Sequence, residues 1–236
     1  MQEKHQPSTG DSGAVTTKPE LLLTADGSPT LRWAHLDETY HSRHGAVQES
    51  LLVFIQRGLL HSFSTESLTI LEVGFGTGLN ALLTVRHAEG KSVHYISLET
   101  YPLPTDLYEA LSYPEAGPDE LLQHMHVVAW NEAVQILPHF LLEKRTDPIQ
   151  QFSAPNGSID LIYYDAFGPR TQPEMWTPEI FARLYDSLSE GGVLVTYCAK
   201  GQVRRDMQSA GFVVQRLPGP IGKREMIRAT KTKSVG

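Results

Sequence analysis

Short apolar runs alternate along most of this chain with longer stretches whose apolar residues recur every three or four positions. The short runs predict buried strands, and the longer amphipathic stretches predict helices. We expect strands over residues 69–73, 93–99, 125–130, 159–164, 192–198, 212–217 and 225–230, and helices over residues 78–88, 104–113, 131–143, 177–188 and 201–210. Regular alternation of strand and helix predicts a doubly wound α/β fold around a parallel sheet.

The last two predicted strands break this alternation, because only Leu217-Pro-Gly-Pro-Ile-Gly222 separates them. A connection of this length is too short for a crossover helix, so we expect an antiparallel hairpin. The result is a seven-stranded sheet with an antiparallel last strand, which a plain dinucleotide-binding fold lacks.

The chain before residue 63 has a different pattern. Residues 1–18 are polar and predict a disordered tail. Two apolar runs, 21–24 and 30–33, flank Asp26-Gly27 and predict a hairpin, and residues 44–59 can form an amphipathic helix. We therefore expect a tail (1–18), an N-terminal hairpin and helix extension (19–62) and a main domain (63–231).

Composition excludes several classes of protein. The chain has 236 residues, of which 40% are hydrophobic, enough for one packed domain. No apolar run approaches 18 residues, and no apolar segment of a signal peptide is present, so we expect no membrane span. The single cysteine, Cys198, excludes an intrachain disulfide and fits a reducing cytoplasm. The histidine pairs lack the further ligands of zinc or iron sites, so no metal is expected.

Charge is distributed unevenly. The net charge is −7, yet residues 200–236 carry nine Lys or Arg and two acids, which leaves −14 on the remainder. A basic C-terminal part is compatible with a phosphate-bearing partner. A solvated helix face followed by a basic tail explains the same charges.

The most specific stretch is Thr69-Ile-Leu-Glu-Val-Gly-Phe-Gly-Thr-Gly-Leu-Asn80. Glycines at 74, 76 and 78 let the backbone turn sharply and approach a ligand. A dinucleotide fingerprint requires glycine where Leu79 stands, and a phosphate-binding P-loop requires a lysine that is absent. The remaining pattern, E-x-G-x-G-x-G beginning at Glu72, resembles motif I of the class I S-adenosylmethionine-dependent methyltransferases. A tight turn without a ligand is the alternative.

Two acids end other predicted strands. Glu99 follows the second strand, where a carboxylate can accept hydrogen bonds from both ribose hydroxyls of an adenosine. Asp165 begins Asp165-Ala-Phe-Gly-Pro169 after the fourth strand. A carboxylate there can accept a hydrogen bond from an amine and orient it for methyl transfer, and Phe167 can stack on a base. The alternatives are a solvated acid at Glu99 and a turn cap at Asp165.

Several linked motifs together resemble one family. Gly74-Phe-Gly-Thr-Gly-Leu-Asn80, Asp165-Ala-Phe-Gly-Pro169, Lys200-Gly-Gln-Val-Arg-Arg205 and Gly222-Lys-Arg-Glu-Met226 occur in order, preceded by Glu38-Thr-Tyr-His-Ser-Arg-His-Gly-Ala-Val-Gln-Glu49. They look like the methyltransferase module of MnmC-type tRNA-modifying enzymes, called MnmD when it stands alone. The resemblance covers residues 21–231.

The resemblance implies a function and a set of site residues. The substrate would be a wobble uridine in the tRNA anticodon loop that bears a 5-aminomethyl group, and the product 5-methylaminomethyl-2-thiouridine. No oxidase module follows in this sequence, so we expect no flavin and a separate enzyme that supplies the amine. Asp165 and Phe167 would be catalytic. The cofactor-binding residues would be Glu72, Gly74, Phe75, Gly76, Thr77, Gly78, Asn80, Glu99, Trp130, Asn131 and Asp165. The RNA-binding residues would be Lys200, Arg204, Arg205, Lys223 and Arg224.

Three other functions compete with this one. A methyltransferase for a small-molecule or protein amine would share the fold and cofactor, and its basic residues would be incidental. A non-catalytic nucleoside-binding or RNA-binding protein would bind cofactor without turnover. An NAD-dependent oxidoreductase is disfavoured by Leu79 and the terminal hairpin. The sequence carries no signal for an oligomeric state.

Overall fold

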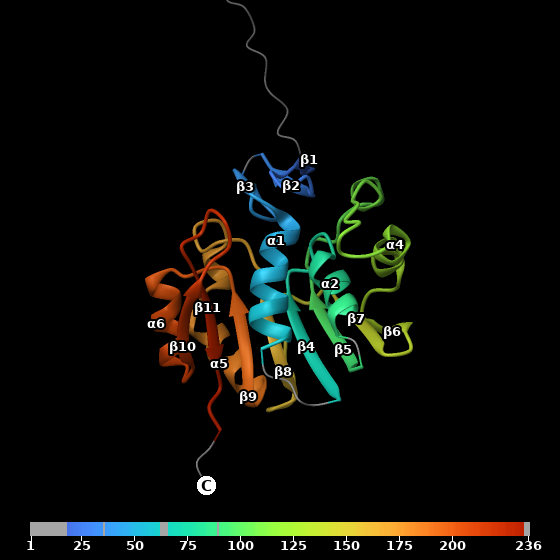
Figure 1. The fold of residues 1–236 in the computed structure, drawn as a ribbon. Helices are drawn as coiled ribbons and strands as arrows, with labels where there is room; N and C mark the ends of the chain where they lie inside the picture. The colour runs from blue at the N-terminus through green and yellow to red at the C-terminus, as the bar shows by residue number, and fades with distance from the viewer. Residues whose placement is uncertain (1–17, 35, 62–65, 89, 234–236) are drawn as a thin grey trace, which may run out of the picture.

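The computed structural model describes residues 18–34, 36–61, 66–88 and 90–233, and its centre is an eight-stranded sheet (Figure 1). The strand order is β10-β11-β9-β8-β4-β5-β7-β6. The strands are β4 (Ser67–Val73), β5 (Ser92–Leu98), β6 (Glu132–Leu137), β7 (Phe140–Arg145), β8 (Ile159–Tyr164), β9 (Leu188–Thr196), β10 (Val213–Pro218) and β11 (Glu225–Thr230). Strands β7, β5, β4, β8 and β9 are parallel, whereas β11 runs antiparallel to β10 and β9. The predicted doubly wound sheet with a reversed last strand is confirmed, with β6 as an eighth strand.

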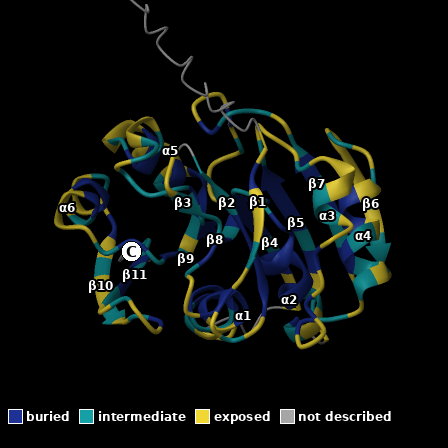
Figure 2. Ribbon diagram, turned by 90° about the horizontal axis from the view of Figure 1, so that it is seen from above, coloured by how far each residue is buried: buried dark blue, intermediate teal, exposed yellow. Residues whose placement is uncertain are grey.

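Helices cover both faces of the sheet and bury two apolar clusters. One face carries α1 (Ala46–Ser50), the π-helix η1 (Leu51–Leu59), α2 (Leu79–His87), α3 (Thr105–Tyr108) and α4 (Asp119–Val127). The other carries the 3₁₀-helix η2 (Pro173–Met175), α5 (Pro178–Ser187) and α6 (Gly201–Ser209). Leu161 and Tyr163 of β8 face the first cluster, and Ile162 and Tyr164 face the second, as the period of a strand requires. Figure 2 shows the central strands buried, in contrast to the exposed residues of the edge strands β6 and β10.

A three-stranded antiparallel sheet lies above the carboxyl ends of the parallel strands (Figure 1). It consists of β1 (Glu20–Leu23), β2 (Pro29–Trp33) and β3 (Glu38–Thr39). The predicted hairpin at Asp26-Gly27 is confirmed: Gly27 has φ +82°, and the Asp26 carboxylate accepts a hydrogen bond from the Ser28 amide at 3.1 Å. The predicted amphipathic helix is also present, but it continues from α1 as a π-helix.

The structure corrects the elements expected between residues 119 and 145. The first half of the predicted strand 125–130 lies in helix α4, and the predicted helix 131–143 is the β6–β7 hairpin. Helix α4 follows Pro118, carries acids in its first turn and buries Leu122 and Met125, one turn apart. Pro138 falls in the middle of the expected helix, where it would remove a hydrogen bond and clash, and it instead stands in the turn of the hairpin. The predicted helix 104–113 is reduced to the single turn of α3.

Two other expectations are limited by what the structure describes. The predicted disordered tail lies outside the described residues except for Lys18, whose ammonium group is 3.0 Å from the Asp106 carboxylate. The boundary between the extension and the main domain stays a prediction. Within the described part of the chain, no helix is long and apolar enough to cross a membrane.

Candidate active site at the carboxyl ends of the parallel strands

A cavity of about 690 Å³ opens where the loops after β4, β5, β7 and β8 meet the N-terminal sheet. Binding sites in open α/β sheets occupy this edge. The predicted site residues that line the cavity are Gly74, Phe75, Gly76, Thr77, Asn80, Glu99, Asp165 and Phe167. Residues almost a hundred positions apart in the sequence, from Gly74 to Phe167, thus lie together in the wall of one cavity.

The glycine loop joins β4 to α2 and requires its glycines. Gly74, Gly76 and Gly78 have φ values of +98°, +51° and +76°, which other residues rarely adopt. A Cβ atom on Gly74 would also lie 2.9 Å from the carbonyl oxygen of Asp165. Gly78 does not line the cavity, because it caps the N-terminus of α2 and packs on α4. The amides of the three glycines are bonded within the protein, to the Leu98 carbonyl, the Glu99 carboxylate and the Phe75 carbonyl, which leaves for a ligand the amides of the residues between and after them, at the start of α2.

Glu99 lies at the tip of β5 and supports the glycine loop. Its carboxylate oxygens accept hydrogen bonds from the backbone amides of Gly76 at 3.1 Å and Tyr101 at 2.9 Å. Burial raises the pKa of this carboxyl above its ordinary value. Each oxygen retains a second lone pair, so the carboxylate can also accept hydrogen bonds from a diol in the cavity.

Asp165 stands at the tip of β8, beside the glycine loop. Its Oδ2 atom accepts a hydrogen bond of 2.9 Å from the side-chain amide of Asn80, in the first turn of α2. Burial raises the pKa of Asp165 well above its ordinary value. The negative charge of Glu49 also raises this pKa, whereas the positive charge of Lys223 lowers it. The Asn80 bond fixes the carboxylate orientation, so Asp165 presents a held oxygen to the cavity.

Glu72 takes a different position from the one predicted. It is fully buried beneath the glycine loop and does not line the cavity. Its Oε2 atom accepts a hydrogen bond of 2.6 Å from Ser97, and its Oε1 atom has no hydrogen-bond partner. Burial raises the pKa of Glu72 to about 8. Any influence of this residue on a bound cofactor is therefore indirect.

Trp130 and Asn131 also lie outside the cavity, so their contacts with a cofactor stay a prediction. The Trp130 ring packs against the Lys144 ammonium group at 4.3 Å and is perpendicular to the Phe75 ring at 6.0 Å. Asn131 has φ +63° and accepts a hydrogen bond from the Thr146 amide at 3.0 Å, which is a local turn contact. Trp130 thus packs on Phe75 of the glycine loop, and Asn131 is bonded to the end of β7.

The loop after β7 occupies the position that was assigned to Trp130 and Asn131. It contributes Asp147, Pro148, Ile149 and Gln150 to the cavity wall. Asp147 pairs with Arg145 at 2.7 Å, and its carboxylate can accept a hydrogen bond from an exocyclic amine. In the sequence, the Asp147-Pro148 pair after the apolar run of β7 indicated this loop. The incorrect prediction of a helix over residues 131–143 concealed that signal.

The N-terminal sheet closes the cavity with residues to which the sequence analysis assigned no role, although Tyr40 and His41 belong to the motif at 38–49. Trp33, Tyr40 and His41 line the wall, and the Tyr40 ring meets Phe167 edge to face at 5.2 Å. His41 is buried with a pKa lowered to about 4 by that burial, so its imidazole is neutral. Its ring nitrogens lie 3.2 Å from the Thr30 hydroxyl and 3.5 Å from that of Thr77 in the glycine loop. The extension is thus part of the site.

None of the five predicted RNA-binding residues lines the cavity. Lys200 and Arg205 are exposed on α6, Arg204 is half-buried there, and Arg224 is exposed in the turn before β11. Lys223 forms an ion pair with Glu49 of α1, and its ammonium group lies 3.8 Å above the Tyr197 ring. This pairing makes Lys223 a poor candidate for a phosphate contact.

The donor set of the cavity fits an adenosine-containing cation. The glycine loop provides amides and a close backbone approach, Glu99 provides diol acceptors, and Asp147 is an acceptor at the opposite wall. Buried carboxylates with raised pKa values are stabilised in their ionised form by a nearby positive charge. No cluster of three or more metal-ligating side chains occurs among the described residues.

Comparison with known proteins agrees with this geometry. Residues 140–232 match a family model described as S-adenosyl-L-methionine-dependent methyltransferase. The bifunctional protein MnmC of Pseudomonas fluorescens (strain Pf0-1), named for tRNA 5-methylaminomethyl-2-thiouridine biosynthesis, is 34% identical over 229 residues, which are 89% of this chain and 34% of that protein. The chain thus spans about a third of the length of the curated relatives it matches.

Solved structures show the same relationship. The crystal structure of MnmC2 from Aquifex aeolicus superposes with a TM-score of 0.75 and 28% identity, over 91% of this chain and 70% of that one. Spermidine synthase from Thermotoga maritima superposes with a TM-score of 0.57 and 13% identity, over 94% and 72% of the two chains, which shows a shared fold.

Proposed function

We propose that this chain, a member of the MnmC-type S-adenosyl-L-methionine-dependent methyltransferases, methylates the aminomethyl nitrogen of a 5-aminomethyl (2-thio)uridine at the tRNA wobble position. The observation that carries the proposal is the place of Asp165. A carboxylate held by Asn80 at 2.9 Å shares a cavity with the glycine loop and with an aromatic pair suited to a base.

The cofactor site uses the glycine loop, Glu99 and Asp147. S-adenosyl-L-methionine supplies a methyl group on a positively charged sulfonium. The loop amides and Asn80 would hold its methionine part, Glu99 its ribose hydroxyls, and Asp147 its adenine amino group. Glu72 would act from beneath, by fixing the loop through Ser97.

Asp165 would orient the acceptor. The nitrogen must present its lone pair to the methyl carbon, and a hydrogen bond from the amine to Asp165 fixes that direction. The raised pKa of Asp165 also makes its carboxylate a better proton acceptor than an ordinary aspartate. Phe167 would stack on the uridine ring, with the perpendicular Tyr40 ring beside it, and an unpaired anticodon loop presents that base at low unstacking cost.

Basic residues outside the cavity would contact the tRNA backbone. Lys200, Arg204, Arg205 and Arg224 remain candidates, whereas Lys223 is paired with Glu49. Phosphate contacts of this kind position an RNA and carry little sequence information. A separate enzyme would supply the aminomethyl uridine, and the reaction would take place in the cytoplasm.

The decisive experiment compares Asp165→Asn with the wild type on tRNA that carries the aminomethyl uridine. Cofactor affinity should stay within about threefold, and turnover should fall about 10²-fold or more, because a positioned acceptor is lost. Asp186→Asn, an exposed aspartate on α5, is the matched control. Product is identified by nucleoside mass spectrometry.

Three results would contradict the proposal. Near wild-type turnover of Asp165→Asn would remove the assigned role of the carboxylate. Faster methylation of a small amine or a protein than of tRNA would indicate a different acceptor. Cofactor binding without methyl transfer to any of these would indicate a non-catalytic protein.

A further inference from the structure

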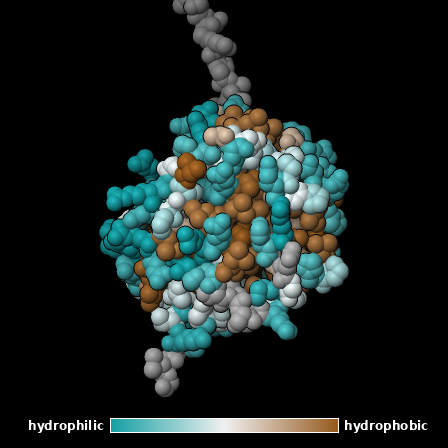
Figure 3. Space-filling model, in the orientation of Figure 1, coloured by the Kyte–Doolittle hydropathy of each residue, from teal (hydrophilic) through white to brown (hydrophobic). Residues whose placement is uncertain are grey.

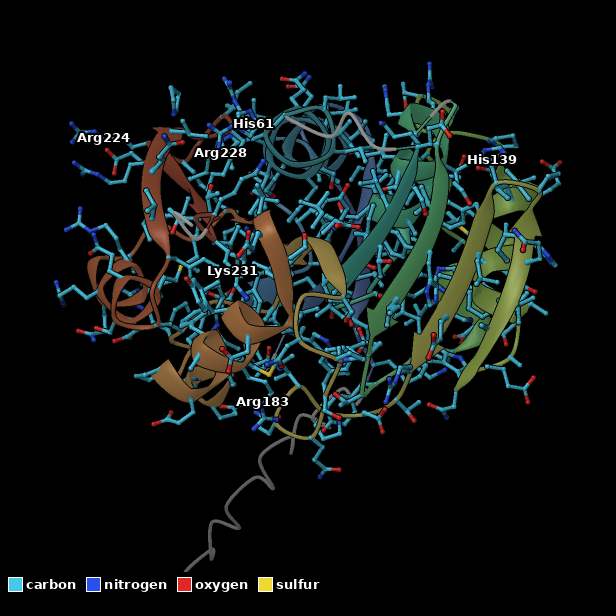
Figure 4. The ribbon with its side chains drawn as sticks, turned by 90° about the horizontal axis from the view of Figure 1, so that it is seen from below. His61, His139, Arg183, Arg224, Arg228 and Lys231 are labelled. Atoms are coloured by element: carbon cyan, nitrogen blue, oxygen red, sulfur yellow. The ribbon has the colours of Figure 1, made fainter. Side chains whose placement is uncertain are left out.

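A pair of arginines lies outside the cavity, on the face of the sheet that η1 covers. Arg57, in the last turn of η1, and Arg228, in the middle of β11, point toward the same region, with His61 just beyond η1. Residues Met226 and Ile227 of β11 face the first and second apolar clusters, so Arg228 faces the side of η1. Figure 4 shows Arg228 and His61 near each other between η1 and β11.

The two arginines repel each other and disfavour the protonated form of His61. The positive charge of Arg57 adds to the effect of burial in lowering the pKa of Arg228, and both arginines add to the lowering of the His61 pKa by burial. Neighbouring like charges destabilise the folded state unless a group of opposite charge lies between them.

No acid among the described residues neutralises the two arginines. Within the described ranges, neither Arg57 nor Arg228 forms an ion pair, and the Nε atom of each is buried without a hydrogen-bond partner. The only described hydrogen bond of either guanidinium runs from Arg228 to the Gln215 side chain at 2.8 Å. The chain has 27 acids for 20 Lys and Arg, so unpaired neighbouring arginines are not explained by a shortage of carboxylates.

The neighbouring Arg216 shows the opposite arrangement. It lies on β10 opposite Ile227, hence on the other face of the hairpin, and pairs with Glu225 at 3.3 Å. One arginine of the hairpin is therefore neutralised, while the one facing η1 is left with free donors.

We infer that Arg57 and Arg228 form a binding site for a backbone phosphate of RNA, with His61 beside them. The inference rests on the proposed function, and it gives the tRNA a second contact beyond the wobble base. Two guanidinium groups can each offer paired N–H donors to phosphate oxygens.

The position of the site suits a stem whose loop enters the cavity. Glu49 of α1, whose charge acts on Asp165, precedes Arg57 on a continuous helical segment. Eight residues rise about 12 Å in an α-helix and less in a π-helix. Figure 3 shows a largely hydrophilic surface over β10 and β11 on this side of the molecule.

The test is the salt dependence of tRNA binding. Arg57→Gln and the double variant Arg57→Gln/Arg228→Gln should lower the slope of log K against log salt concentration by about 1, and tRNA affinity at low salt by about tenfold. Turnover at saturating tRNA should remain that of the wild type. Arg57 has no described hydrogen bond, so its substitution should leave folding intact even if the double variant is unstable. Arg216→Gln is the matched control and should keep the wild-type slope.

The outcomes separate this inference from the proposed function. An unchanged slope in folded Arg57→Gln, or an equal fall in Arg216→Gln, would overturn the phosphate site while wild-type methylation of tRNA still stands. A further outcome is that inorganic phosphate stabilises the wild type and not Arg57→Gln while the salt slope of tRNA binding is the same in both. That result would assign the site to a small anion and would also overturn the inference. Absence of methyl transfer by the wild type would instead contradict the proposed function.

Discussion

Replacing Glu72 with glutamine should stabilise this protein, and the gain should increase with pH. Glu72 is fully buried and one of its oxygens has no hydrogen-bond partner, so ionisation costs free energy in the folded state. Burial raises its pKa from 4.5 to about 8. A group with a raised folded-state pKa contributes stability that is complete below about pH 4.5 and is lost as pH rises through 8.

The magnitude follows from the two pKa values. The full difference corresponds to roughly 5 kcal/mol at about 1.4 kcal/mol per pKa unit, as an upper limit. Between pH 6 and pH 8.5 the wild type should lose roughly 2–3 kcal/mol through this residue, and the neutral glutamine variant should not. With a urea m-value of about 2 kcal/mol/M, the midpoint difference between the two proteins should widen by about 1 M.

Urea unfolding of both proteins at several pH values from 6 to 8.5 measures this difference directly. Asp165 and Glu99 also carry raised pKa values; because the charge of Glu72 contributes to the raised pKa of Asp165, its removal acts on Asp165 in the same direction and adds to the gain at high pH. Glu132→Gln, at the exposed start of β6, controls for the loss of one charge. A stability difference that does not change with pH would refute the reasoning, as would a variant less stable than the wild type at pH 8.5.

Two further predictions concern residues that the structure reassigns. Asp147→Ala should weaken cofactor binding about tenfold in calorimetry, because one hydrogen bond to a charged group is lost. Asn131→Gly, which keeps the positive φ, should change the affinity less than about twofold. Equal losses of affinity in the two variants would restore Asn131 to the cofactor site. Lys223→Met leaves the charge of Glu49 unbalanced and so raises the pKa of Asp165 further, and the acidic limb of the profile of kcat/KM against pH should move to higher pH. A lower salt slope of tRNA binding in this variant, with an unmoved profile, would make Lys223 a phosphate contact instead.

The parts of the fold that depend on local pattern were predictable from the sequence. Strand β4, the glycine loop and the start of α2 follow from an apolar run and three glycines whose positive φ values the structure contains. The β10–β11 hairpin follows from a connection too short for a helix. In both cases one chain segment carries all the information.

The region from residue 119 to residue 150 was not predictable in the same way. The run from Met125 to Trp130 has the composition of a strand, yet burial of Leu122 against the glycine loop favours a helix there. The error displaced the third parallel strand by about 15 residues and hid Asp147. Pro138 was the signal that could have corrected it.

The acceptor side of the cavity depends on tertiary contacts that no local pattern describes. Tyr40 meets Phe167 because contacts such as that of His41 with Thr77, and the hydrogen bond from Thr171 to Glu38, hold the N-terminal sheet over the loops of the site. The burial of Glu72 beneath that loop likewise could not be read from its place in the E-x-G-x-G-x-G pattern, which is the same whether the acid faces the cavity or the sheet.

Three carboxylates give the site its electrostatic character: Glu72 is fully buried, and Glu99 and Asp165 are partly exposed in the cavity wall. Glu72, Glu99 and Asp165 lie within or directly below one cavity, and burial raises the pKa of each. Such acids are costly in an empty site, and a cation stabilises their ionised forms. A sulfonium cofactor together with an amine acceptor brings that positive charge, whereas an anionic ligand would add to the repulsion. The cavity is therefore suited to a cation at its centre, and the phosphates of an RNA substrate must be bound outside it, on surfaces such as that of Arg57 and Arg228.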